Sequence, residues 1–363
     1  MQGATGDHLL GVAATRVLQN SPVTERSLAV LATGAVLAFC YVVRELLVPT
    51  IVALVLAFTV HPFVAWLERR RVPHPLAALA GTLLATGAIV LVFVLLYGGA
   101  QDLAGELPAY EDRLRDTWDR LTRSFLHLRA QTQDLAPPRQ PGTVRVEETV
   151  PWTALVLGTA QGAVAIAAAA AVAVFVLYFA LAEGPRYRRK FLEHAGKDPD
   201  GRARARLALE ELHRDVSQYM WNRILLNVLL GLATWLAYAA WLDHAAVWGF
   251  TTALLHFIPY VGPAVGLAFP VLMAVLQYGT LKHALIAGGV YLALVSAQGN
   301  VVDPIFLGKQ LRLNALAVFV GSLFFFWLWG PIGLFVAVPV LSTIRIACKY
   351  VPRLGAIADF LAE

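Results

Sequence analysis

Long runs of apolar residues, repeated along most of the chain, constrain this sequence more than any other feature. Two of them, 46–67 and 76–100, are each long enough to cross the hydrocarbon core of a bilayer, which takes about 20 residues of α-helix. Of the 363 residues, 58% are apolar and only 15% are charged, and the mean hydropathy is +0.63. Such a chain has too few polar side chains to cover a water-soluble fold. The sequence therefore predicts an all-α membrane protein with several transmembrane helices.

The apolar runs and the polar stretches between them divide the chain into ordered segments. Only Arg44 and Glu45 separate the first two runs, so we expect a helical hairpin there. Asp198-Pro199-Asp200 is a helix start signal. The predicted segments are a cytoplasmic N-terminal arm (1–27), transmembrane helices 1–3 (28–100), an outer amphipathic helical segment (101–151), transmembrane helix 4 (152–183), a cytoplasmic basic helix (184–217), transmembrane helices 5–8 (218–348) and a cytoplasmic tail (349–363). The last apolar runs are expected at 281–297, 315–329 and 332–346, with a second break at Gly330-Pro331 between the last two.

The distribution of Lys and Arg predicts the orientation. With eight crossings, both termini share one side of the membrane with the loops around Arg70, Arg189 and Lys309, and that side holds most of the 29 basic residues. Basic loops stay preferentially in the cytoplasm. Both termini are therefore expected to be cytoplasmic, and the basic charge indicates topology rather than nucleic-acid binding, for which the chain has no motif.

The stretch from His256 to Pro263 breaks an apolar run and is the first candidate site. Two prolines and a glycine within five residues prevent a continuous helix. In hydrocarbon, such a break is tolerated where protein or a water-filled cavity satisfies the freed backbone groups, and transporters bind substrates at such breaks. We expect a re-entrant pair over 245–278, with Gly262 allowing close approach of a solute; the alternative is a plain turn. The pathway candidates here are His256, Pro259, Tyr260, Gly262 and Pro263.

Polar residues within or beside other apolar runs extend this candidate pathway. Such residues are costly in a membrane and usually face a cavity or a partner. The alternatives are hydrogen bonds between helices for the asparagines of the fifth span, and capping or turn roles for the stretch after residue 297. The further pathway candidates are Asn222, Asn227, Gln298, Asn300, Asp303 and Pro304.

The apolar pattern of the outer segment, 101–151, indicates that copies of the chain associate. Its apolar residues, from Leu103 to Leu128, recur at steps of three and four, which is the pattern of an amphipathic helix. This stripe could lie on the lipid surface, on the spans or on another subunit. The fourth span is rich in alanine, and small residues allow close helix packing in lipid. We expect a homo-oligomer, with a ring as one arrangement, alongside the lipid bilayer as a partner.

Motifs for enzymatic chemistry are missing from the sequence. It has no phosphate-binding glycine loop, no His-Glu-x-x-His, no Gly-x-Ser-x-Gly and no cysteine cluster. Cys40 and Cys348 lie far apart inside apolar runs and are expected to be small buried side chains. We therefore expect no enzyme activity, no cofactor and no metal site.

Three motifs in the second half of the chain resemble those of the AI-2E transporter family. They are Ile258-Pro-Tyr-Val-Gly-Pro263, Gln298-Gly-Asn-Val-Val-Asp-Pro-Ile305 with Gly308-Lys309 and Leu313, and Gly330-x-x-Gly333 followed by Ala337-Val-Pro339. The order of spans also matches over nearly the whole chain. The resemblance implies a bacterial inner-membrane exporter, with autoinducer-2 as substrate of some members and sodium/proton exchange proposed for others. The chain departs from the family where it has Gln298 instead of an acid and Asn314-Ala315 instead of His-Pro.

The residues and the resemblance together predict a transporter that exports a small polar solute. Autoinducer-2 is the candidate solute, which would place the protein in quorum sensing. A sodium/proton antiporter is an alternative, for which Asp303 is the nearest titrating acid. A non-transporting membrane scaffold is another, but a scaffold gains nothing from broken helices in lipid.

Overall fold

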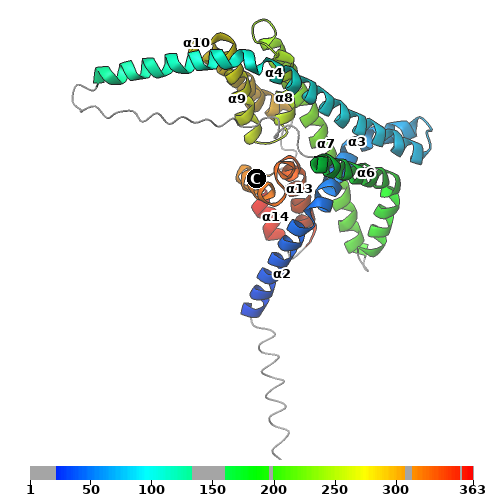
Figure 1. The fold of residues 1–363 in the computed structure, drawn as a ribbon. Coiled ribbons are helices and arrows are strands. Elements are labelled where there is room, and N and C mark those ends of the chain that lie inside the picture. The colour runs from blue at the N-terminus through cyan, green and yellow to red at the C-terminus, as the bar shows by residue number, and fades with distance from the viewer. Residues whose placement is uncertain (1–21, 133–159, 196–198, 307–312, 352–353, 363) are drawn as a thin grey trace, which may run out of the picture.

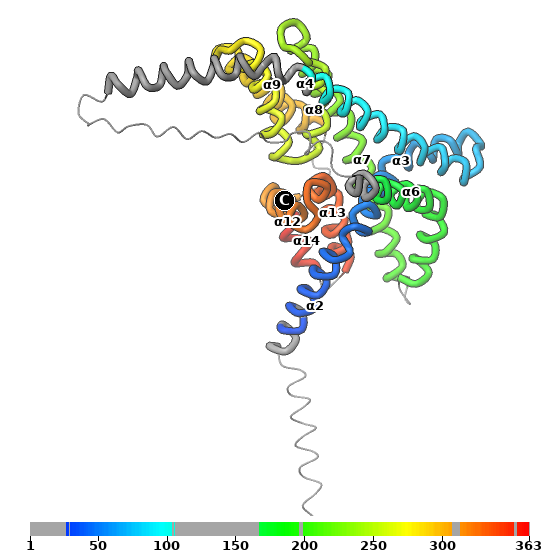
Figure 2. Tube along the Cα trace, viewed as in Figure 1, coloured from blue at the N-terminus to red at the C-terminus, as the bar shows by residue number. Residues whose placement is uncertain are grey.

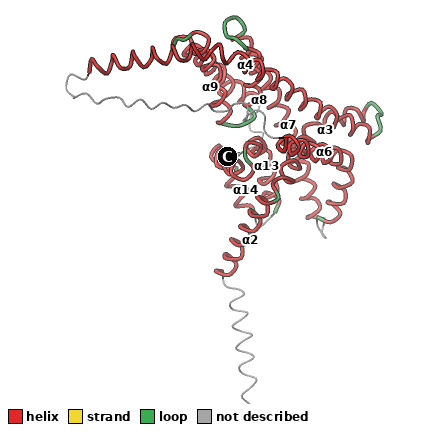
Figure 3. The backbone as a smooth tube through the Cα atoms, in the orientation of Figure 1, coloured by secondary structure: helices red, strands yellow, loops and turns green. Residues whose placement is uncertain are grey.

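The described chain is almost entirely helical, as Figure 3 shows in red. The only β-pairing in the described ranges is one antiparallel bridge between Leu313 and Ala362. The prediction of an all-α fold is therefore confirmed. The computed structural model describes residues 22–132, 160–195, 199–306, 313–351 and 354–362.

Figure 1 shows the order of the helices along the chain. They are α2 (Pro22–Val42), α3 (Arg44–Arg69), α4 (His74–Thr132), α6 (Ala160–His194), α7 (Pro199–Tyr238), α8 (Ala245–Leu255), α9 (Val261–Tyr278), α10 (Leu281–Ala297), the π-helix η1 (Gln298–Val302), α11 (Asp303–Phe306), α12 (Ala315–Trp329), α13 (Pro331–Tyr350) and α14 (Gly355–Leu361). The predicted boundaries of α10 and α12 match to the residue, because glycine, proline and polar residues flank both runs.

Several helices in the described ranges are long and apolar enough to cross a bilayer. There are seven, within 44–69, 74–103, 167–194, 199–238, 261–278, 281–306 and 331–350. Three apolar helices are shorter: Val30–Val42, Ala245–Leu255 and Ala315–Trp329. The protein is thus a multi-pass membrane protein. In the predicted re-entrant pair, the second arm, α9, has 18 residues and is long enough to cross.

The first two helices do not form the predicted hairpin. Val43, the single residue between α2 and α3, has φ −92° and ψ 13°. Its N–H donates to the carbonyl of Phe39, and the N–H of Leu47 donates to the carbonyl of Val43. Because these bonds continue the helical pattern, the chain runs on from α2 into α3 without reversing (Figure 1). The charges of Arg44 and Glu45 interrupt the apolar run but not the helix.

The third span and the amphipathic segment form one continuous helix, α4, of 59 residues. Its first turns pack against α3 and α6 (Figure 2). The helix predicted from the periodicity is confirmed up to Thr132. The remainder of that segment, 133–151, and the start of the predicted fourth span, 152–159, lie outside the described residues.

The predicted basic helix, 184–217, is not a separate element. Its first part is the end of α6, which continues from the fourth span to His194. Its second part is the start of α7, which begins at Pro199 and runs unbroken for 40 residues. Proline is favoured in the first turn of a helix because its missing N–H has no helical partner there. The predicted helix start at Asp198-Pro199-Asp200 is therefore confirmed to within a residue.

Close contacts between backbones join the helices around the break. Gly231 of α7 and Gly249 of α8 face each other, and a Cβ on either would come within 2.6 Å of the other's carbonyl oxygen. Beyond this contact, a buried cluster joins α7, α8, α9 and α10. Its members are Tyr238, Leu242, Ala245, Trp248, Met273, Ala274, Leu276 and Ala287. The two arms of the break are thus fixed against α7 and α10.

The C-terminal helices form a second hairpin with its own core. Gly330, at φ 71° and ψ −154°, adopts a backbone conformation that favours glycine and reverses the chain between α12 and α13. Phe325, Leu328, Ala337 and Leu341 form the buried core of this hairpin, against which Cys40 of α2 packs. Cys40 and Cys348 are both free thiols, and Cys348 is buried.

Ion pairs connect the hairpin of α12 and α13 to α7. Lys349 Nζ lies 2.7 Å from the Glu211 carboxylate, and the Tyr350 hydroxyl donates to the same carboxylate at 2.7 Å. The buried Arg345 lies within 4.0 Å of Glu211 and Asp215. α7 therefore contacts the α8–α9 pair through glycines and the α12–α13 hairpin through charged side chains.

Candidate functional site

The chain does break at the predicted stretch, and its backbone there is unusual. α8 ends at Leu255 and α9 begins at Val261. Between them Tyr260 adopts φ 62° and ψ −50°, a conformation that residues with a side chain rarely take. The N–H of Gly262 donates to the carbonyl of Ile258, so the freed groups are satisfied partly within the loop.

Gly262 has a different role from the predicted one. A Cβ at this position would lie 2.0 Å from the carbonyl oxygen of Leu255. The space that the missing side chain leaves is therefore filled by the end of α8 and is not open to a solute. Gly333 has the same relation to the carbonyl oxygen of Phe325, also at 2.0 Å. The α8–α9 pair and the α12–α13 hairpin thus each depend on a glycine near the start of their second helix.

Arg223 of α7 connects the break to the polar stretch that follows α10. Its Nη2 donates to the carbonyl of His256 at 2.8 Å, and its Nη1 lies 3.3 Å from Oδ2 of Asp303. The His256 carbonyl is one of those left without a helical partner where α8 ends, and a cation at a helix C-terminus is favourable. The Arg223 side chain is 13% exposed and that of Asp303 is 25% exposed, so this ion pair is partly buried.

A π-helical turn places Gln298 and Asp303 together. The N–H of Asp303 donates to the carbonyl of Gln298, five residues back. Pro304 has no N–H, and in an α-helix its ring would clash with the carbonyl of Asn300, so a wider turn accommodates it. Gln298 is buried, whereas Asn300 is exposed and donates to the carbonyl of Ser296 in its own helix.

Buried polar atoms without a partner are concentrated around this ion pair. Asn227, one turn along α7 from Arg223, is 1% exposed, and neither its Nδ2 nor its Oδ1 has a hydrogen-bond partner. The same holds for both side-chain polar atoms of Gln298, for Nε2 of His256, for Oδ1 of Asp303 and for Nε of Arg223. Leaving such atoms unpaired costs about 1–3 kcal/mol each. We call these five residues the polar cluster.

The structure brings together only some of the predicted pathway residues. Four of them, Asn227, His256, Gln298 and Asp303, belong to the polar cluster. Asn222 makes an interhelical bond from its Nδ2 to the carbonyl of Phe306, which was the structural alternative. The remaining residues lie elsewhere: Pro259, Gly262 and Pro263 in the loop and first turn of α9, and Tyr260, Asn300 and Pro304 at exposed positions.

Tyr260 and Asn314 lie where the α8–α9 pair meets the α12–α13 hairpin. The Tyr260 ring packs edge-on against Phe319 of α12, with ring centroids 5.4 Å apart, and its hydroxyl donates to the carbonyl of Ala315. Asn314, at one of the departures from the family pattern, accepts a hydrogen bond from the N–H of Leu316 and caps α12. Both residues therefore have a structural contact at the junction of the hairpins.

Arg223 is the site residue that the sequence reasoning missed. It is not among the pathway candidates that the sequence predicts. The signal was nevertheless present, because a charge flanked by Asn222 and Asn227 inside an apolar run usually pairs with another polar group. Tyr291 was also missed. It is 0% exposed, and its ring centroid lies 6.1 Å from that of His256.

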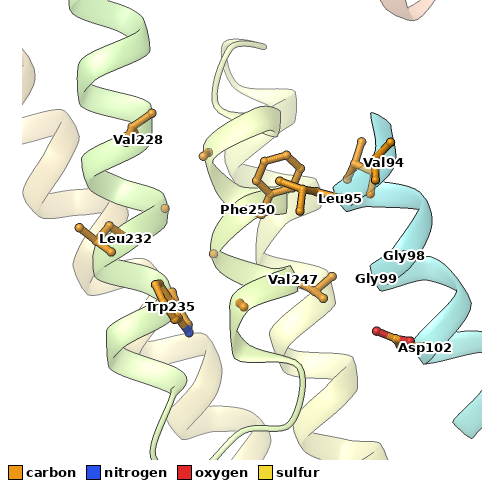
Figure 4. Close-up of a pocket in the computed structure, with 15 residues that line it drawn as sticks. Val94, Leu95, Gly98, Gly99, Asp102, Val228, Leu232, Trp235, Val247 and Phe250 are labelled. Carbon is orange, nitrogen blue, oxygen red and sulfur yellow. The ribbon is translucent and has the colours of Figure 1, made fainter. Parts of the chain in front are cut away.

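A second candidate site is an apolar groove between α4, α7 and α8, of about 590 Å³ (Figure 4). The close approach of α7 to α8 at Gly231 and Gly249 forms its floor. Apart from Asp102 and the indole of Trp235, its lining offers no polar side chain. The groove therefore suits an apolar occupant, whereas the polar cluster suits a solute that forms hydrogen bonds.

Apolar helices that are long enough to cross a bilayer, with a helix break and unpaired buried polar groups beside it, are typical of multi-pass membrane transport proteins. The sequence model of a protein family described as "AI-2E family transporter" matches residues 28–353. This chain belongs to the AI-2E transporter family.

Several characterised or named proteins are similar over most of their length. The AI-2 transport protein TqsA of Escherichia coli K12 is 28% identical over 88% of this chain and 90% of its own. A candidate transport protein of Haemophilus influenzae is 28% identical over 94% of this chain and all of its own. YhhT, a candidate transport protein of Escherichia coli K12, is 25% identical over 86% of both chains. These matches support a transporter of a bacterial inner membrane.

Proposed function

We propose that this protein exports a small polar solute past the polar cluster, where α7, the end of α8 and the π-turn meet. The observation that carries the proposal is the concentration of buried, unpaired polar atoms on Asn227, His256, Gln298 and Asp303. In a membrane protein such atoms have no bulk water to compensate them. A solute with several hydroxyl or carbonyl groups would satisfy them during passage.

Autoinducer-2 is the solute that we propose first. It is a small, oxygen-rich molecule, and the similarity to TqsA, which is named for AI-2 transport, supports this choice. The cluster also contains the Asp303–Arg223 ion pair, which is the one observation that favours coupling to an ion. The Asp303 carboxylate already has Arg223 as its partner, which leaves it less available to a sodium ion, so we place solute export before sodium/proton exchange.

Substitution of Asn227 by leucine tests the proposal. The variant removes two unpaired polar atoms, so we expect unchanged or higher thermal stability. If the solute uses these atoms, flux per folded molecule should fall at least about tenfold, the equivalent of roughly 1.4 kcal/mol. The measurement is uptake of labelled autoinducer-2 and other small polar solutes into proteoliposomes, with and without sodium and proton gradients.

Ser322→Ala is the matched control for this experiment. Ser322 is also buried, and its Oγ also lacks a partner, but it lies on α12 outside the polar cluster. Its removal should leave flux unchanged. Equal flux in the Asn227→Leu variant and the unmodified protein would contradict a pathway at the cluster, and flux of sodium or protons alone would favour the antiporter.

We also propose a homo-oligomer in which the second half of α4 contacts a neighbouring copy. The apolar periodicity of 103–128 supports it. A helix with an apolar stripe needs a surface on which to bury it. Native mass spectrometry in mild detergent should find a multiple of 39.4 kDa, and a mass of one chain would exclude the proposal.

A further inference from the structure

Arginines from two helices meet in a pocket far from the polar cluster. It lies between the last turns of α6 and the first turns of α7 and has a volume of about 460 Å³. Two of its arginines come from each helix. The residues that line it are Pro185, Arg188, Arg189, Leu192, Glu193, Arg202 and Arg206.

The acids around this pocket do not balance its arginines. Glu210 is shared, because Arg188 Nη2 and Arg206 Nε lie 3.1 Å and 2.9 Å from the same carboxylate oxygen. The hydrogen bond from Arg206, with further attraction from both arginines, lowers the pKa of Glu210, so this carboxylate is ionised at neutral pH. Arg189 lies 3.9 Å from Glu193. Four arginines thus face two carboxylates, which leaves an excess of two positive charges.

Arg202 is the arginine most available to a ligand. Among the described residues it has no ion pair, and it is exposed at the edge of the pocket on the same face of α7 as Arg206, one turn away. The Arg189 guanidinium is held only at the outer limit of an ion pair with Glu193. These two side chains can therefore turn toward an anion without breaking the shared contact at Glu210.

Exposed apolar side chains beside the pocket indicate that it lies at the membrane surface. Tyr187 and Phe191 of α6 are 66% and 54% exposed, and Leu207 of α7 is 53% exposed. Aromatic rings next to arginines are typical of the layer where lipid headgroups meet hydrocarbon. The apolar part of α6 ends a few residues earlier, at Ala182.

We propose that this pocket binds the phosphate group of an anionic phospholipid in the leaflet around α6 and α7. Guanidinium groups recognise phosphate oxygens through paired, charge-assisted hydrogen bonds, and Arg189 and Arg202 supply them from opposite walls. The excess positive charge favours an anionic lipid over a zwitterionic one. The apolar neighbours, Tyr187, Phe191 and Leu207, contact the upper acyl chains, which free phosphate lacks. Basic residues that only set topology need not converge on one pocket.

The test compares two double variants with the same loss of charge. Arg189→Gln/Arg202→Gln removes the two proposed phosphate ligands, whereas Arg186→Gln/Arg204→Gln removes one exposed arginine from each of the same helices outside the pocket. Each full-length protein is purified in detergent and titrated with phosphatidylglycerol, phosphatidylcholine or inorganic phosphate. Bound lipid is counted by native mass spectrometry, and folding is checked by circular dichroism.

The unmodified protein should retain phosphatidylglycerol at least about fivefold more than phosphatidylcholine. The pocket variant should lose this preference and the control variant should keep it. Equal losses in the two variants would overturn the pocket, because they would show a general effect of charge. Displacement of phosphatidylglycerol by millimolar inorganic phosphate would overturn the lipid assignment and identify a free anion as the ligand.

Discussion

Replacing Arg223 with leucine should abolish transport and strongly reduce the stability of the folded protein. The substitution leaves Asp303 as a partly buried carboxylate without its cation and removes the donor to the His256 carbonyl. Breaking a fully buried ion pair from one side costs about 3–5 kcal/mol, and solvent around Asp303 reduces this to about 2–3 kcal/mol here. The measurements are the thermal unfolding temperature in detergent and flux per folded molecule in proteoliposomes.

A double variant separates folding from transport. In Arg223→Gln/Asp303→Asn no charge remains buried, and the glutamine amide can still donate to one of the oxygens nearby. We expect most of the lost stability to return, since neutral replacement of a buried ion pair is often tolerated. Flux should stay low if the pair contacts the solute. Full recovery of flux would show that the pair only holds the helices together.

Arg214→Leu is the control on the same helix. Its Nε lies 3.0 Å from Asp215, but 69% of its side chain is exposed. Pairs of this kind contribute about 0–1 kcal/mol. The unfolding temperature should change little, and a change as large as that of Arg223→Leu would contradict the distinction between the two pairs.

Substitution of Gly262 by alanine should cause the other large effect. The added Cβ would lie 2.0 Å from the Leu255 carbonyl oxygen, a distance at which the backbone must move. Because the obstacle is a carbonyl and not a flexible side chain, we expect a loss of roughly 4 kcal/mol or more, and little folded protein. Gly333→Ala should behave in the same way, since it meets the Phe325 carbonyl oxygen. Folded yield and unfolding temperature measure the effect.

Gly289→Ala gives the opposite expectation within the same fold. Apart from its chain neighbours and the backbone of its own helix, no described atom lies within 4 Å of the Cβ position of this residue on α10. Alanine in a helix is favoured over glycine by about 0.4–1 kcal/mol, so the variant should be slightly more stable. If Gly262→Ala and Gly289→Ala were equally stable, the close contact at the break would be wrong.

Local sequence signals predicted the helix boundaries well. The break at 256–260, the end of α10 and the limits of α12 follow from prolines, glycines and polar residues that act on the backbone within a few residues. The same reasoning failed at Val43, because charged side chains can extend from a helix without ending it. It also separated the third span from the amphipathic segment, although no residue between them stops α4.

The candidate site was only partly predictable. Polar residues in apolar runs identified Asn227, His256, Gln298 and Asp303, because burying them in lipid is costly. The sequence placed Gln298 and Asn300 together, but only Gln298 is buried, since the chain forms a π-turn there. The ion-pair partner of Asp303 could not be predicted either, since Arg223 lies 80 residues earlier in the chain.

By itself the sequence determined that the chain lies in a membrane, that its fold is all-α, and where the chain breaks at 256–263 and at 330–331. These features follow from hydrophobicity and from the backbone limits of proline and glycine, which are local properties. Tertiary structure alone decided what the breaks contact. The close approach of Leu255 to Gly262 depends on how α8 packs against α9, and the Arg223–Asp303 pair depends on how α7 packs against the π-turn. Such distances follow from the packing of whole helices, because each helix is rigid and its neighbours set where its side chains lie.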